Sequence, residues 1–250
     1  MAKINKTDYE ALEFRINLLE VLFNGGKGSG NWGHSGRKGK VGGSGKGGGI
    51  KGIADKSIER AKTEEPEVSK DLTSALKDAG AEFGGFDYRL KGSDSLQRKI
   101  KQDQKDSGSP RTAEALRKAA GAINDNLRYT ALLSPQNYTE GYNKIKNDLE
   151  SKGYEFVKVK NLMGFPEEGN PYRGVNAQVK NKNGYIFELQ FHTDQSFDIK
   201  QNKIHKDYEI ARNPVKYSEK ERNEATKRMF RAYDSLELPK DVQNIKPFKK

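Results

Sequence analysis

The sequence contains no cysteine and only three histidines, at positions 34, 192 and 205. The lack of cysteine excludes a disulfide framework, a thiolate nucleophile and a cysteine-rich zinc site. Histidines so far apart in sequence disfavour a metal hydrolase built on several imidazoles. No apolar run approaches the roughly 20 residues that a membrane-spanning helix requires, and no basic and apolar leader opens the chain. We therefore expect a protein that has no membrane partner and acts in the cytoplasm.

Hydrophobic residues make up only 33% of the 250 residues, and 46 Lys+Arg against 35 Asp+Glu give a net charge of +11. This charge suits a polyanionic partner, either nucleic acid or nucleotide phosphates. The glycines are unevenly spread, because 14 of the 26 lie between Gly25 and Gly52. Such a stretch cannot bury enough apolar surface to fold. We therefore divide the chain into an amphipathic helix (1–24), a Gly/Lys-rich flexible linker (25–52), a folded domain (53–238) and a basic tail (239–250).

Apolar spacing within the domain predicts an α+β fold. We expect helices over 53–77, 93–104, 109–123, about 142–152, 198–211 and 218–235, and strands over 86–91, 127–133, 154–160, 172–180 and 185–193. Asn183-Gly184 between the last two strands is a strong hairpin signal, so the sheet is expected to be at least partly antiparallel.

Polar side chains alternate with apolar ones along this predicted hairpin. The second strand places Glu188, Gln190 and His192 on one face and Tyr185, Phe187, Leu189 and Phe191 on the other. In the first strand, Tyr172, Asn176 and Gln178 alternate with Val175, Ala177 and Val179. Two adjacent polar rows are typical of a cleft floor, although an ordinary solvated sheet face would give the same pattern.

A basic motif precedes the hairpin in the chain. Arg89 and Lys91 would point the same way from the strand over 86–91, and Ser95 and Lys99 share one face of the helix that follows. Cations, a glycine turn and a helix N-terminus together favour a polyphosphate. The alternative is a solvated basic helix start.

Asp125 lies at the mouth of the strand over 127–133, where it could simply turn or cap the chain. If Asp125 and Glu188 meet, they supply two carboxylates for Mg²⁺, which usually binds through one or two carboxylates and substrate phosphates.

Four motifs in this order match a known family. They read RLKGSDSLQRK, INDNLRYT, NPYRGVNAQV, and FELQFHT followed by His205-Lys206-Asp207-Tyr208. Over residues 53–235 the chain resembles the synthetase domain of RelA/SpoT homologues, and it is most similar to the single-domain, toxin-like members. The resemblance implies a mixed, nucleotidyltransferase-like sheet surrounded by helices. It also implies transfer of pyrophosphate from ATP to a ribose 3′-hydroxyl of GDP or GTP, giving (p)ppGpp, or of an adenine nucleotide or the tRNA 3′ end.

The resemblance also implies a role for each candidate residue. Arg89, Lys91, Ser95 and Lys99 would hold the ATP phosphates, and Asp125 would bind Mg²⁺. Glu188 would complete the metal site or act as the base on the 3′-hydroxyl. Tyr172 would stack on the acceptor base, and Asn176, Gln190, His192 and His205 would lie at neighbouring acceptor positions. A toxin of this kind implies growth inhibition and a neutralising antitoxin.

Two departures from the housekeeping synthetases leave the acceptor open. Arg128 and Thr130 follow the predicted metal aspartate where glycine and arginine are usual, and His192 stands where arginine is common. Both fit the toxin-like pattern. The hydrolase half and regulatory domains of long family members are absent from the sequence.

The glycine-rich tract around Trp32 is similar to tracts in phage head-associated proteins, which toxin-like domains can follow. This similarity points to a phage-encoded or virion-associated protein whose N-terminal helix binds a phage structural protein. The alternative function is a non-catalytic phage-structural or nucleic-acid-binding protein that retains the fold.

Overall fold

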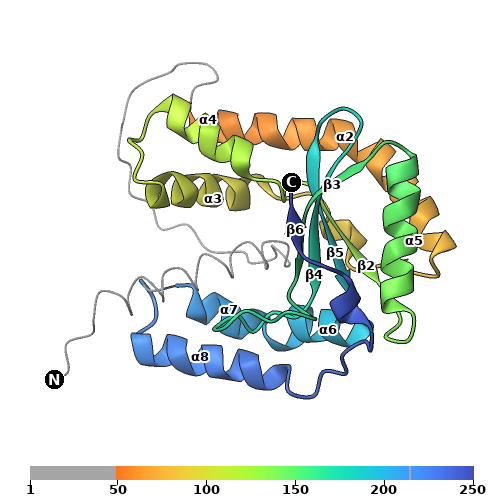
Figure 1. Cartoon of the computed structure of the whole chain (residues 1–250). Coiled ribbons are helices and arrows are strands. Elements are labelled where there is room, and N and C mark those ends of the chain that lie inside the picture. Colours follow the sequence, from red (N-terminus) through yellow and green to blue (C-terminus); the bar gives the residue numbers. More distant parts are fainter. Residues whose placement is uncertain (1–48, 214) are drawn as a thin grey trace.

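A six-stranded mixed sheet lies at the centre of the computed structural model, which describes residues 49–213 and 215–250 (Figure 1). The predicted α+β class is therefore confirmed, with a partly antiparallel sheet covered by helices. The predicted helix over 1–24 and most of the predicted linker over 25–52 lie outside the described residues. The first described helix begins at Ile50, within the range predicted as linker.

The strand order in the sheet is β1-β2-β5-β4-β3-β6. These strands are β1 (Glu82–Phe83), β2 (Arg128–Leu132), β3 (Glu155–Asn161), β4 (Val175–Lys180), β5 (Ile186–His192) and β6 (Phe248–Lys249). β2 and β5 are parallel, and the other neighbouring pairs are antiparallel. The β4–β5 hairpin forms as predicted, with Gly184 at φ 75°, a backbone conformation that glycine adopts without steric cost.

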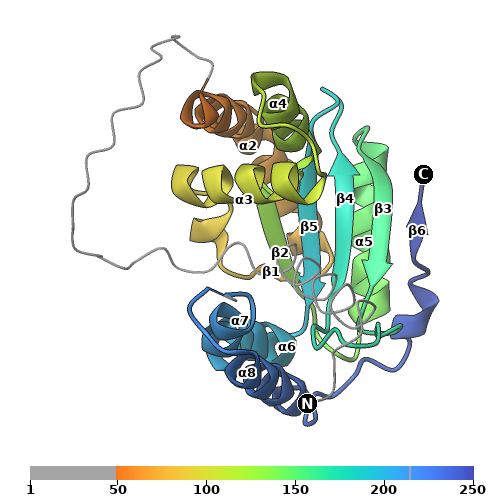
Figure 2. The same cartoon turned by 90° about the vertical axis from the view of Figure 1, so that its left-hand side faces the viewer.

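Helices cover the two faces of the sheet differently. The α-helices are α2 (Ile50–Asp78), α3 (Ser93–Asp106), α4 (Ala113–Ala122), α5 (Tyr138–Ser151), α6 (Asp194–Asp198), α7 (His205–Ala211) and α8 (Glu219–Ala232). Figure 1 shows α5 on one side of the sheet, with α3, α4, α7 and α8 on the other. Figure 2 looks onto this second side, where β5, β4 and β3 are visible beside α3 and α7. None of the described helices is long and apolar enough to cross a membrane.

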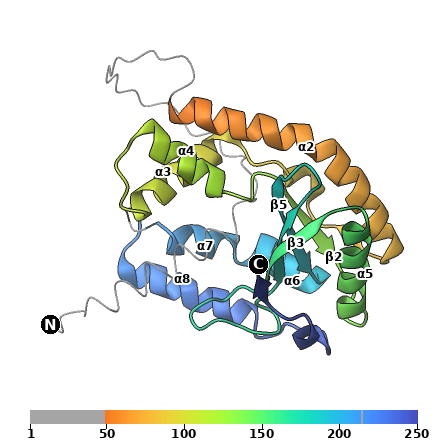
Figure 3. The same ribbon diagram turned by 45° about the horizontal axis from the view of Figure 1, so that its top comes forward.

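The main core lies between α2, α5 and the sheet. The apolar row of β5, Phe187, Leu189 and Phe191, is fully buried there, as alternation predicts. A second cluster joins α7 and α8 to Tyr172, and a third joins α3 and α4 to the start of α2. Figure 3 shows these two helical groups apart from each other, with α2, α3 and α4 in one and α7 and α8 in the other.

Two predicted elements differ from the structure. The strand expected over 86–91 is instead the short 3-10 helix η1 (Phe86–Tyr88), followed by a single bridge between Leu90 and Leu127. Gly85 starts this turn at φ 61°, and Phe86 packs against Phe83, with ring centroids 4.7 Å apart. The helix expected over 198–211 is divided between α6, the π-helical segment η2 (Ile199–Lys203) and α7.

The predicted basic tail contributes to the fold. Residues 242–244 form the 3-10 helix η3 (Val242–Asn244), and β6 pairs with β3. Val242 and Ile245 are buried, and the Asn161 side chain donates to the carbonyl oxygens of both, at 2.7 and 2.9 Å. The ordered chain therefore extends beyond residue 238.

Candidate active site

A cleft of about 330 Å³ opens on the side of the sheet away from α5. Its walls come from α3, the segment before β2, and strands β3, β4 and β5. The polar residues that line it are Lys99, Asp103, Asn124, Asp125, Lys158, Lys160, Asn176, Gln178 and Glu188. Because two acids predicted to act together both line it, we call it the carboxylate cleft.

The strand register explains how one wall of this cleft arises. Asn176 lies opposite Gln190 and Gln178 opposite Glu188, so the two predicted polar rows are neighbours. On its other side β5 pairs with β2, which places Arg128 opposite Glu188. Glu188 thus lies between an amide and a guanidinium on adjacent strands.

Two lysines surround Asp125. Lys91 Nζ lies 2.5 Å from Asp125 Oδ2, and Lys99 Nζ lies 3.2 Å from Oδ1. The bridge between Leu90 and Leu127 aligns the segment before α3 with β2, and this alignment brings Lys91 beside Asp125. Burial alone would raise the pKa of Asp125, but the charges of Lys91 and Lys99 outweigh it and lower that pKa to about 2. Burial lowers the pKa of Lys91 to about 8 despite the carboxylate.

Glu188 is buried, and only one of its two carboxylate oxygens accepts a hydrogen bond. Its Oε1 accepts a hydrogen bond from Gln190 Nε2 at 3.0 Å. Its Oε2 lies 3.8 Å from Arg128 Nη1, too far for a hydrogen bond, and no described residue donates to it. Burial raises the pKa of Glu188 in spite of the Arg128 charge. A buried carboxylate oxygen without a donor is costly unless a ligand satisfies it.

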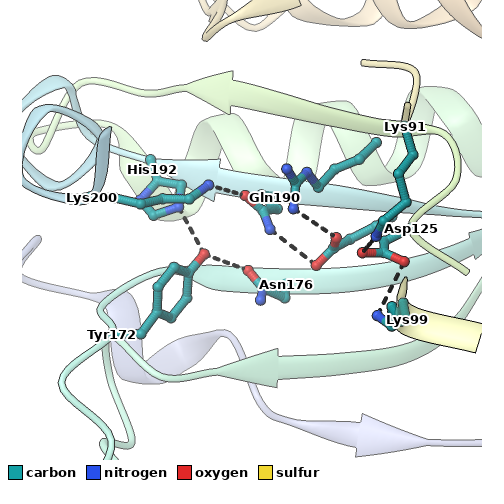
Figure 4. Close-up of polar contacts among 10 residues, drawn as sticks. Lys91, Lys99, Asp125, Tyr172, Asn176, Gln190, His192 and Lys200 are labelled. Carbon is teal, nitrogen blue, oxygen red and sulfur yellow. Dashed lines mark hydrogen bonds and ion pairs between the residues drawn. The ribbon is translucent and has the colours of Figure 1, made fainter. Parts of the chain in front are cut away.

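Gln190, which donates to Glu188, also contacts Lys200, and this contact is visible in Figure 4. Gln190 Oε1 accepts from Lys200 Nζ at 2.5 Å, and both side chains are buried. Burial, together with the nearby Arg128 charge, lowers the pKa of Lys200. Lys200 comes from η2, between α6 and α7.

The predicted stacking residue Tyr172 is fully buried. Its hydroxyl donates to Asn176 Oδ1 at 2.7 Å and lies 2.7 Å from His192 Nε2. Gly174 makes room for this contact, because a Cβ there would lie 2.6 Å from the Tyr172 hydroxyl. Stacking on an acceptor base requires an accessible ring face, so the predicted role of Tyr172 does not fit this arrangement.

His192 is also fully buried. Its Nδ1 lies 2.8 Å from Ser196 Oγ, within the capping box that begins α6. Burial and the charge of Lys200 lower the pKa of His192 well below its usual value, so the ring is neutral at pH 7. His192 is therefore held as a neutral ring between Tyr172 and Ser196, and its role at the acceptor stays a prediction.

Arg89 lies apart from the other predicted phosphate ligands. Its Nε donates to Glu65 of α2 at 2.5 Å, and its guanidinium lies 4.0 Å from the ring centre of Phe86. The prediction that Arg89 and Lys91 point the same way from a strand is wrong, because the segment turns at η1.

Ser95 and Lys99 line a second, basic pocket of about 410 Å³ between α3 and α7. The other side chains around it are Arg98, Lys101, Gln102, Lys105, Glu209, Arg212 and Asn213. Lys99 lines both this basic pocket and the carboxylate cleft, so the two hollows are neighbours. His205 is half-buried at the start of α7 and lines neither.

Mg²⁺ fits this donor set. Residues 49–213 and 215–250 hold no group of three or more Asp, Glu or His side chains that could bind a metal by themselves. Mg²⁺ needs fewer protein ligands, since substrate phosphates and water complete its shell. Asp125 would hold it, and Glu188, whose Oε2 accepts no hydrogen bond from the described residues, would complete the site where it does not serve as the base.

Three lysines near the cleft, Lys158, Lys160 and Lys200, were not among the predicted site residues. Lys200 was assigned only to a helix, and Lys158 and Lys160 only to a strand. Alternation along β3 is the signal that could have placed Lys158 and Lys160 on one face. No local pattern indicates that Lys200 is buried, because its contact with Gln190 depends on the π-helical turn.

Comparison with protein-family models and with curated proteins found no match. Ten chains of solved structures are similar to this chain, and two of them are named below. One is the complex between the Type VI effector Tas1 and its immunity protein, with 17% identity and a TM-score of 0.46 over 72% of this chain and 94% of that one. The other is small alarmone synthetase 1 from Bacillus subtilis bound to its product pppGpp, with 14% identity and a TM-score of 0.45 over 72% of this chain and 87% of that one.

Proposed function

We propose that this chain is a pyrophosphokinase that transfers pyrophosphate from ATP to a ribose 3′-hydroxyl. The observation that carries the proposal is that one cleft contains both Asp125, between two lysines, and the buried Glu188, whose Oε2 accepts no hydrogen bond from the described residues. The order of the four sequence motifs supports the same reaction. The acceptor is a guanine nucleotide, an adenine nucleotide or the tRNA 3′ end, and growth inhibition with a neutralising partner belongs to the proposal.

Each part of this reaction has a candidate group. The acceptor oxygen attacks the β-phosphorus of ATP, the bond from that phosphorus to the oxygen bridging to the α-phosphate breaks, and AMP leaves. Glu188 Oε2 takes the hydroxyl proton, a role that suits a carboxylate whose pKa burial has raised. Lys99 and Lys91 oppose negative charge on the phosphates. Mg²⁺, when bound by Asp125, supplies further positive charge to the phosphate oxygens and leaves Glu188 Oε2 for the proton.

Strand-borne lysines give the cleft a cationic wall. Lys158 and Lys160 on β3 line it opposite α3, and Lys160 has only a distant acidic neighbour, Glu167 at 3.7 Å. Burial and the charge of Lys160 lower the pKa of Lys158, which favours an anionic ligand beside them. The acceptor is therefore proposed to carry phosphate near its reacting hydroxyl.

An acceptor screen tests the proposal. Purified folded protein is incubated with Mg²⁺ and ATP labelled on the γ-phosphate, in the presence of GDP, GTP, adenine nucleotides, or deacylated and charged tRNA. We expect labelled product on at least one acceptor. Folded wild-type protein that labels none of them contradicts the proposal and favours the non-catalytic alternative.

A further inference from the structure

Lys200 occupies an unusual place beside the carboxylate cleft. Its side chain is buried, and its Nζ donates to Gln190 Oε1 at 2.5 Å. Gln190, which is itself fully buried, donates through Nε2 to Glu188 Oε1 at 3.0 Å. Figure 4 shows Lys200 pointing at Gln190 from the segment between α6 and α7. Lys200 is thus linked by two hydrogen bonds, through Gln190, to a carboxylate that we propose to be catalytic.

The hydrogen-bonding capacity of Lys200 fixes the orientation of Gln190. The ammonium form of Lys200, whose pKa burial lowers to about 7, has three donors and no acceptor, so in this form it bonds only to the amide oxygen of Gln190. The amide NH₂ group must then face Glu188. The opposite orientation would place the amide oxygen against the Glu188 carboxylate, where two acceptors meet without a proton between them.

The burial of Lys200 is not explained by an ion pair. Among the residues that the structure describes, no carboxylate lies within ion-pair distance of its Nζ. An unpaired buried cation is costly, and an apolar side chain of the same length would fill this position at lower cost. The observed contact is instead directed at a single amide oxygen.

The backbone around Lys200 supports the same reading. Ile204 N donates to Ile199 O at 3.0 Å, five residues back, so η2 departs from a regular α-helix. Single π-helical turns of this kind are rare and occur frequently at functional sites. Lys200 lies inside this turn, directly after the buried Ile199.

We infer that Lys200 is a positioning residue for the pyrophosphoryl transfer. Through Gln190 it holds the NH₂ group on Glu188 Oε1 and so fixes the orientation of the carboxylate that receives the proton of the acceptor hydroxyl. The inference rests on the proposed function, because it concerns the same carboxylate.

The main test replaces Lys200 by an unbranched apolar residue of similar size. Lys200→Met removes the donor and shortens the side chain by one atom. We expect kcat to fall about 10-fold or more, and KM for ATP to change less than about 2-fold, because a misdirected general base affects the chemical step more than binding. The melting temperature should change little, since the gain from removing a buried cation is offset by leaving Gln190 Oε1 buried without a donor. Lys203→Met is the matched control, because Lys203 lies in the same segment with an exposed side chain.

A double-mutant cycle tests whether Lys200 acts through Gln190. If it does, Lys200→Met adds nothing to the loss already caused by Gln190→Leu. Additive losses in kcat, or wild-type kcat in Lys200→Met, overturn the inference while leaving the proposed function intact. An inactive wild-type protein overturns both.

A second variant decides the matter if Lys200→Met does not fold. Gln190→Glu keeps an acceptor for Lys200 but has no NH₂ group for Glu188, so we expect folded protein with a similar loss of kcat. Wild-type kcat in Gln190→Glu overturns the inference.

Discussion

Removing the charge of Asp125 should destabilise the fold because Lys91 would stay buried without a counter-charge. The perturbation is Asp125→Asn, which preserves the size of the side chain. Lys91 is 1% exposed and Asp125 is 5% exposed, so water cannot replace the lost contact. Breaking a buried pair on one side typically costs about 3–5 kcal/mol.

The pKa of Asp125 gives an independent magnitude. The difference between its usual value of 3.8 and its value of about 2 in the fold corresponds to about 2.4 kcal/mol. A group whose pKa is lowered on folding contributes stability above its usual pKa and loses it as the pH falls. The two figures together predict a loss of about 3 kcal/mol at pH 7, or about 6–12 °C in melting temperature for a domain of this size.

Urea unfolding at pH 7 and at lower pH measures this effect. The deficit of Asp125→Asn should be largest at neutral pH and should shrink as the pH falls from 3.8 towards 2. Asp103→Asn is the control, because Asp103 lines the same cleft but burial raises its pKa, so removing its charge should cost no stability. If Asp125→Asn is as stable as wild type at pH 7, the assigned charge cluster is wrong.

Two further predictions concern the buried contact between Tyr172 and His192. Gly174→Ala should cost about 1–3 kcal/mol, because the new Cβ would lie 2.6 Å from the Tyr172 hydroxyl and 2.7 Å from His192 Cε1. Gly121→Ala, in α4 with no atom within 4 Å of the new Cβ, should instead stabilise by about 0.5–1 kcal/mol, and chemical denaturation compares the two. In the fold, His192 has a pKa well below its usual value, so below about pH 6.5 only the unfolded chain takes up a proton at this residue. The free energy of unfolding of wild type should therefore fall, relative to that of His192→Gln, by up to about 1.4 kcal/mol per pH unit. If the stability of wild type and of His192→Gln changes in parallel between pH 7 and 5, His192 is not buried as a neutral ring. Burial also raises the pKa of Glu188, which makes the fold more stable as the pH falls. Both proteins contain Glu188, so its contribution cancels in this comparison.

Local patterns were sufficient for the hairpin that forms one wall of the cleft. The apolar row of β5 and the Asn183-Gly184 pair each specify one alignment, because a shift by one residue would expose Phe187 and Leu189. The start of α3 at Ser93 and the left-handed Gly153 after α5 follow local rules in the same way.

Long-range contacts decide what the patterns did not predict. The sequence around Arg89 alternates like a strand, but Glu65 of α2 and the aromatic packing of Phe86 favour a turn. Tyr172 matched a stacking residue, yet Gly174 allows its ring to fold inward onto His192. In the C-terminal segment, the lysines suggest an exposed tail, although Val242 and Ile245 are buried. The Asn161 side chain, far away in the sequence, donates hydrogen bonds to the carbonyl oxygens of both.

The central claim is that Glu188 serves a transfer that releases AMP from ATP, and product stoichiometry tests it most directly. With the best acceptor from the screen, we expect one AMP for each labelled product and no ADP. Glu188→Gln should lower the rate by about 10²–10⁴-fold. Its melting temperature should change no more than that of the control variant. The control is Glu155→Gln, because Glu155 lies in the same sheet outside the cleft and pairs with Lys180. Release of ADP with a single phosphate on the acceptor, or a wild-type rate in Glu188→Gln, would contradict the account.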